Sequence, residues 1–125
     1  MKAILTITCI AALTAAPVYA DCPYPAAPAK LPDGASATLE ERLAGKKDVD
    51  AYQKAINEYT TCIDKELGEK IAKAGDQLKP EQKADMQKME AQKHNAAVDQ
   101  LQSVADRFNE QVKVYKAKSA EKSKG

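Results

Sequence analysis

The sequence has few of the large side chains that fill a thick globular core. It contains no tryptophan and one phenylalanine, Phe108, in 125 residues, whereas alanine, lysine, glutamine and glutamate are frequent. This composition favours helices and is poor in the residues of a thick core. It therefore predicts an all-α, elongated structure.

Groups that carry catalysis or bind cofactors are also scarce. His94 is the single histidine, and the sequence has no nucleophile–base pair, cofactor motif or C-x-x-C pair. The formal net charge is only +1, which argues against a protein whose main task is nucleic-acid binding. The sequence therefore predicts no enzyme activity, no cofactor and no nucleic-acid partner.

Residues 1–20 have the pattern of a cleavable signal peptide. Lys2 supplies a positive start, residues 3–16 form an uncharged apolar run, and Val18 and Ala20 take the −3 and −1 positions before a cleavage site. The run is too short to stay as an anchor across a hydrocarbon core of about 30 Å. We expect a periplasmic or secreted protein with no stable membrane insertion after cleavage.

Cleavage leaves two cysteines, Cys22 and Cys62, because Cys9 lies in the signal peptide. One pair in an oxidising compartment allows one intramolecular disulfide, which we interpret as a structural staple. Asp21 stands directly before Cys22, where a lipoprotein needs a small residue, so we expect no lipidation. Cleavage also removes Lys2 from the 19 basic residues and leaves 18 against 18 acidic ones.

The mature chain divides into an extended segment, a helical hairpin and a tail. Residues 21–37 contain four prolines, which exclude a helix and favour polyproline II; we call this segment the strap. Residues 38–118 are predicted to form a hairpin, with helices at about 38–74 and about 80–117. Residues 119–125 are expected to be a flexible tail.

Both helices are predicted from apolar residues that recur at steps of three and four. They are Val49, Tyr52, Ile56, Tyr59, Ile63, Leu67 and Ile71 on the first helix, and Met86, Ala97, Leu101, Val104, Phe108, Val112 and Tyr115 on the second. The short linker requires the helices to pack antiparallel, in a coiled-coil-like pair. That arrangement places Ile63 near His94, Ile56 near Leu101 and Val49 near Phe108.

The ends of the helices have their own signals. Thr38 and Glu41 form a capping box, Gly75 suits a left-handed cap at the end of the first helix, and Pro80 suits the first position of the second. Gly68 weakens the first helix by about 1 kcal/mol relative to alanine and is the expected place for a break.

The strap is expected to return along a track of small residues on the flank of the first helix. Ala44, Ala51 and Ala55 share this flank with Cys62. The strap is long enough to reach Cys62, so Cys22 and Cys62 are predicted to form the disulfide. The closed loop of about forty residues would contribute about 4 kcal/mol on the chain-entropy model.

His94 is the first candidate for a functional side chain. It falls on the apolar face, one turn after Glu90. Its ring either ligates a metal or transfers protons, or it packs in the seam and bonds to Glu90 or a strap carbonyl. Met86 and Met89 are soft copper(I) ligands, but helical geometry carries His94 away from both, so packing is the plainer interpretation.

A second candidate is a set of apolar residues that fall off the seam. Leu39 and Leu43 on the first helix, and Met89 and Val114 on the second, are expected to remain partly exposed. A contiguous patch of such residues would mark an interaction surface. We expect a monomer or weak homodimer that contacts another envelope protein.

Four segments carry a resemblance to a known group. Residues 21–25 (DCPYP), 59–62 (YTTC), 92–98 (QKHNAAV) and 107–112 (RFNEQV) resemble an uncharacterised family of small exported proteobacterial helical proteins with one cysteine pair. The resemblance implies export and paired cysteines, and it implies that His94 belongs to a shared structural contact. It transfers no catalytic residues.

Three functions follow as hypotheses. The first is a structural or protein-interaction module of the periplasm. The alternative is a chaperone-like holdase: residues 78–82 (LKPEQ) resemble the Leu-Thr-x-x-Gln motif of small helical periplasmic stress chaperones, with Lys79 in place of threonine. Metal binding is the remote alternative.

Overall fold

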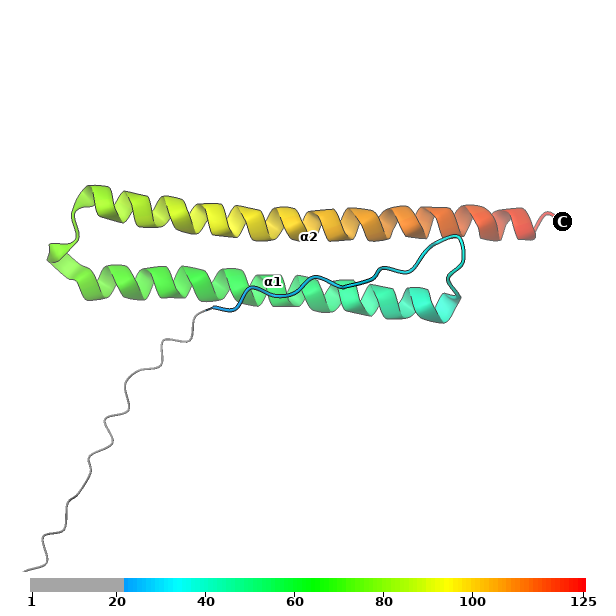
Figure 1. The fold of residues 1–125 in the computed structure, drawn as a ribbon, viewed down its shortest axis with the longest axis horizontal. Helices are drawn as coiled ribbons and strands as arrows, with labels where there is room; N and C mark the ends of the chain where they lie inside the picture. Colours follow the sequence, from blue (N-terminus) through cyan, green and yellow to red (C-terminus); the bar gives the residue numbers. More distant parts are fainter. Residues whose placement is uncertain (1–21) are drawn as a thin grey trace, which may run out of the picture.

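The computed structural model describes residues 22–125, which form two long helices with an extended segment lying along them (Figure 1). Helix α1 spans Leu39–Ala74, the short 3-10 helix η1 spans Gly75–Gln77, and α2 spans Pro80–Lys122. The two long helices run antiparallel and pack against each other. The predicted all-α two-helix hairpin is confirmed, whereas the signal peptide predicted at 1–20 lies outside the described residues.

Helix α1 begins and ends at the predicted signals. The Glu41 N–H donates to Thr38 Oγ1 at 3.1 Å, and the Thr38 N–H donates to Glu41 Oε2 at 2.7 Å. The Thr38 backbone and hydroxyl bonds hold the pKa of Glu41 below its ordinary value. Gly75 ends the helix with φ +50° and ψ −134°, a positive φ outside the usual left-handed helical region. The helix passes through Gly68 without a break.

Helix α2 begins as predicted but ends later. Pro80 takes the first turn, and the Lys79 N–H donates to Gln82 Oε1 at 3.1 Å. The expected end near residue 117 is wrong, because the helix continues to Lys122. Residues 117–122 are mostly alanine, lysine and glutamate, which favour a helix. Lys118 Nζ also donates to the Ala35 carbonyl oxygen of the strap at 3.1 Å.

The core lies in the seam between the helices. Its buried members are Val49, Tyr52, Ile56, Ala97 and Val104, and Tyr59, Leu101 and Phe108 pack against them. This cluster contains both members of two predicted facing pairs, Val49 with Phe108 and Ile56 with Leu101. Ala97 is fully buried in this cluster.

The strap forms a third layer over half of the hairpin. It runs back along α1 from the start of the helix toward its middle (Figure 1), and Ala27 and Leu31 pack against the core cluster. The predicted alanine track is wrong in detail, since Ala44 and Ala51 remain exposed. The strap lies closer to the seam because its apolar side chains bury more area there than on a flank of small residues.

Candidate functional site

A disulfide fixes the start of the strap. Cys22 and Cys62 are bonded, with their Cα atoms 5.8 Å apart, as predicted. Next to this bond, the Tyr24 and Tyr59 rings meet edge to face at a centroid distance of 5.0 Å. Burial, and then the hydroxyl of Tyr24, raise the pKa of Tyr52 to about 12. The cysteine pair is therefore part of a packed structural contact.

The turn at the other end of the strap is bound to α2. The Gly34 N–H donates to Gln111 Oε1 at 2.8 Å, across 77 residues of sequence. A Cβ atom at Gly34 would overlap the carbonyl oxygen of Gln111, so only glycine fits this close approach. This hydrogen bond therefore fixes the end of the strap to α2 at the open end of the hairpin.

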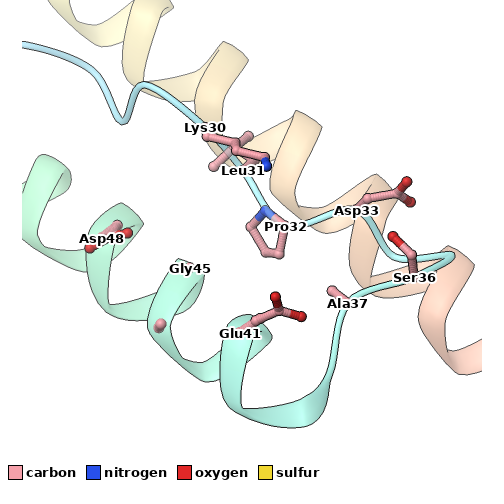
Figure 2. A pocket seen from close by; sticks show the side chains of 10 residues that line it. Lys30, Leu31, Pro32, Asp33, Ser36, Ala37, Glu41, Gly45 and Asp48 are labelled. Atoms are coloured by element: carbon pink, nitrogen blue, oxygen red, sulfur yellow. The ribbon is translucent and has the colours of Figure 1, made fainter.

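A hollow of about 310 Å³ lies where the strap crosses the first turns of α1. Figure 2 shows the Pro32 ring between the strap and the Gly45 turn of α1, with charged side chains around the rim. The lining residues are Lys30, Leu31, Pro32, Asp33, Ser36, Ala37, Glu41, Ala44, Gly45 and Asp48. Glu41 already accepts the helix-capping bond, and the lining contains no histidine or cysteine that would make a nucleophile–base pair with Ser36.

The open end of the hairpin also carries the predicted apolar residues. Leu39 and Leu43 are 58% and 54% exposed on successive turns of α1. Between them, the Arg42 guanidinium lies over the Tyr115 ring, with Cζ 3.4 Å from the ring centroid. Leu39 and Tyr115 line the same surface hollow. The exposed leucines therefore flank a cation–π contact that joins α1 to α2.

The other two predicted residues lie in different places. Val114 is exposed and borders Gly34 of the strap turn, and Gly34 lines the same hollow as Leu39. Met89 is exposed near the opposite end of the hairpin, where it lines a small hollow with Ile63 and Met86. The structure therefore places Leu39 and Leu43 on neighbouring turns at the open end of the hairpin, and Met89 away from them.

Glu90 and His94 are both half-buried on α2. Burial raises the pKa of Glu90, and a hydrogen-bond contact with the Asp64 carboxyl of α1 raises it further. Lys93 and His94 act in the opposite direction, as smaller causes. Asp64, which the sequence pattern did not single out, is thus one cause of the raised pKa of Glu90.

Within residues 22–125, no group of three or more histidine, cysteine, aspartate or glutamate side chains could hold a metal ion. None of the helices in that range is long and apolar enough to cross a membrane.

Sequence reasoning missed Asp64, Gln111 and the Arg42–Tyr115 contact. Arg42 and Tyr115 lie one heptad beyond the predicted Val49–Phe108 pair, so the same register would have placed them together. Asp64 and Gln111 fall outside the apolar pattern and had no such signal. Comparisons with protein-family models, with curated proteins and with solved structures found no match to this chain.

Proposed function

We propose that this chain acts without catalysis, as a protein-interaction module of the bacterial periplasm that presents a helical surface to an envelope partner. The observation that carries the proposal is the exposure of Leu39 and Leu43 on successive turns of α1, at 58% and 54%. Apolar side chains exposed together on neighbouring turns are typical of a surface that another protein covers.

The surroundings of the two leucines favour a surface formed before binding. The capping box at Thr38 fixes the start of α1, and the Arg42–Tyr115 contact fixes this turn against α2. A preformed surface loses little conformational entropy when a partner binds. Tyrosine and arginine are also frequent anchors of interfaces.

The affinity of this surface is expected to be modest. The chain has few aromatic residues, at 5% of the total, and a formal net charge of only +1, so it offers neither many anchors nor strong electrostatic steering. We therefore propose a monomer or weak homodimer that makes transient contacts.

Export is the second part of the proposal. The pattern of residues 1–20 and the Cys22–Cys62 disulfide both support an oxidising compartment. The intact mass of the protein recovered from periplasm should equal that of residues 21–125 less two hydrogens. A retained signal, or a lipid mass on Cys22, would contradict this.

The interaction surface is tested with the double substitution Leu39→Lys, Leu43→Lys. Photo-crosslinking in intact cells detects the partners of the protein. Sedimentation over a wide concentration range measures its self-association. Val98→Lys is the matched control, because Val98 is an exposed apolar residue (44%) in the middle of α2. The double variant should lose the crosslinks to a partner, or the dimer, and the control variant should keep them. Equal behaviour of both variants would exclude this surface.

A second candidate function, a holdase, is favoured by the part of the seam that the strap leaves uncovered. Beyond Cys62, the apolar side chains of Ile63, Leu67, Met86 and Met89 line a hollow of about 100 Å³, and Met89 is 59% exposed. The strap itself is an extended apolar segment seated in the same seam. An extended apolar segment of an unfolded client protein resembles the strap and would bind the uncovered part of the seam in the same way.

Suppression of aggregation separates the two candidates. A holdase should delay the aggregation of several unrelated unfolded proteins, and Met89→Lys should weaken this effect more than Val98→Lys. An interaction module with one partner should protect none of them.

A further inference from the structure

The charge of the protein is unevenly distributed, although the chain as a whole is almost neutral. Residues 113–125, at the end of α2, contain five lysines and one glutamate. On α1, several lysines pair with a carboxylate one turn away, as in Lys46–Asp50 at 2.6 Å. Past Lys113, which pairs with Glu110, no lysine in the described part of the chain forms such an ion pair. The open end of the hairpin therefore carries an excess of positive charge.

Two of these lysines, Lys118 and Lys122, line a hollow of about 340 Å³ between the strap turn and the end of α2. Leu39 and Tyr115 belong to the same lining, which contains no aspartate or glutamate. Lys118 Nζ donates one hydrogen bond, to the Ala35 carbonyl oxygen, whereas an ammonium group has three donors. The Lys122 side chain makes no hydrogen bond or ion pair within residues 22–125. The hollow thus combines an apolar wall with cationic donors that the protein does not use.

The spacing of the two lysines is unfavourable for the helix itself. Lys118 and Lys122 lie one turn apart on α2, and like charges at this spacing destabilise a helix. The Arg42 guanidinium, with Cζ 3.4 Å from the centroid of the Tyr115 ring, adds a third cation beside the hollow. Local costs of this kind are typical of functional sites. An anionic group between the two lysines would remove their repulsion.

We infer that the partner of this surface is a protein segment that carries an acidic side chain beside an apolar one. The carboxylate enters the hollow between Lys118 and Lys122, and the apolar side chain covers Leu39, which lines the hollow, and Leu43, one turn further along α1. The inference rests on the proposed function, because it names the chemistry of the partner at the same surface. A protein segment fits better than a lipid bilayer, because a side chain can enter a concave hollow and a flat layer of headgroups cannot follow it.

The test measures the binding of two labelled peptides to the whole oxidised protein by fluorescence anisotropy. One peptide alternates leucine with glutamate, and the other has lysine in place of each glutamate. The glutamate peptide should bind, and its Kd should rise several-fold as the salt concentration increases from about 10 mM to about 150 mM, because salt screens exposed charge pairs. The lysine peptide should not bind. Equal binding of both peptides, or binding that salt does not weaken, would overturn the inference.

Variants of the lysines locate the binding site. Lys118→Gln, Lys122→Gln should raise the Kd of the glutamate peptide by up to about fivefold per lysine. Lys122→Gln alone should also weaken binding, and it leaves the Lys118 bond to the strap intact. Lys83→Gln, Lys88→Gln is the matched control, because both lysines are exposed on α2 near the hairpin turn and the net charge changes equally. An equal effect of the two double variants would reduce the result to net charge and contradict the inference.

Two further measurements separate this inference from its alternatives. If the wild type sediments with phosphatidylglycerol vesicles and does not bind the glutamate peptide, the surface belongs to a membrane and the inference is wrong. Photo-crosslinking in cells then compares Lys118→Gln, Lys122→Gln with Leu39→Lys, Leu43→Lys. Loss of the same partner crosslink in both variants supports an acidic partner. If only the leucine variant loses it, the proposed function stands and the acidic partner is excluded.

Discussion

Pro32 of the strap packs directly on Gly45 of α1. A Cβ atom at Gly45 would lie 2.5 Å from Pro32 Cδ, 2.6 Å from Pro32 Cγ and 3.4 Å from Phe108 Cε2. Real Cβ atoms do not approach other atoms within 3.0 Å, so a glycine is required for this contact. A residue that weakens the isolated helix thus lets the strap reach the seam.

Replacement of this glycine should lower stability. Gly45→Ala forces Pro32 away from α1 and should cost about 1–3 kcal/mol, the usual range for overpacking. The free energy of unfolding, measured by urea denaturation, checks this value.

Gly68→Ala is the matched control in the same helix. No atom lies within 4 Å of a Cβ at Gly68, so this change should stabilise the protein by about 0.5–1 kcal/mol through helix propensity alone. If both alanine variants gain stability, Pro32 does not require the glycine.

Loss of the disulfide should release the strap. Cys22→Ser or Cys62→Ser should lower the free energy of unfolding by about 4 kcal/mol, because the closed loop of 40 residues no longer restricts the unfolded chain. Trypsin should then cut faster after Lys30, while much of the helical signal in circular dichroism survives. A reductant should reproduce the effect in the wild type and leave the serine variants unchanged.

The turn of the strap should depend on one side chain of α2. Gln111→Ala removes the acceptor of the Gly34 N–H and should cost about 1 kcal/mol. Hydrogen exchange of the Gly34 amide should accelerate. Gln102→Ala, which removes only an exposed bond to Asp106 within α2, should leave that exchange rate unchanged.

The Arg42–Tyr115 contact should depend on the ring and not on its hydroxyl. Tyr115→Leu removes the aromatic face under the guanidinium and should cost about 0.5–1 kcal/mol. Tyr115→Phe keeps that face and should retain most of the stability. An equal loss in both variants would assign the effect to the hydroxyl.

The hairpin could be predicted from the sequence because its signals are local or periodic. The capping box at Thr38, Gly75 at the end of α1, and the three- and four-residue steps each act within a few turns. The antiparallel register then places Val49 with Phe108 in one cluster, as observed.

The strap's path could not be predicted in the same way. An extended segment has no internal hydrogen bonds that fix its position, so its place depends on what it packs against. The small residues at Ala44 and Ala51 suggested a track, but the space at Gly45 and the apolar seam determined the position. The effect of Asp64 on the pKa of Glu90 escaped prediction because acidic residues on long helices are usually solvated.

The disulfide also determines how the molecule responds to a pulling force. Cys22 is covalently bonded to Cys62, which lies well inside α1 and not at its end. Tension applied to the chain at Cys22 therefore enters the molecule through the side of α1, and residues 23–61, which lie inside the loop that the disulfide closes, bear none of it while the bond is intact. The strap would therefore keep its contacts with the helices under such a load.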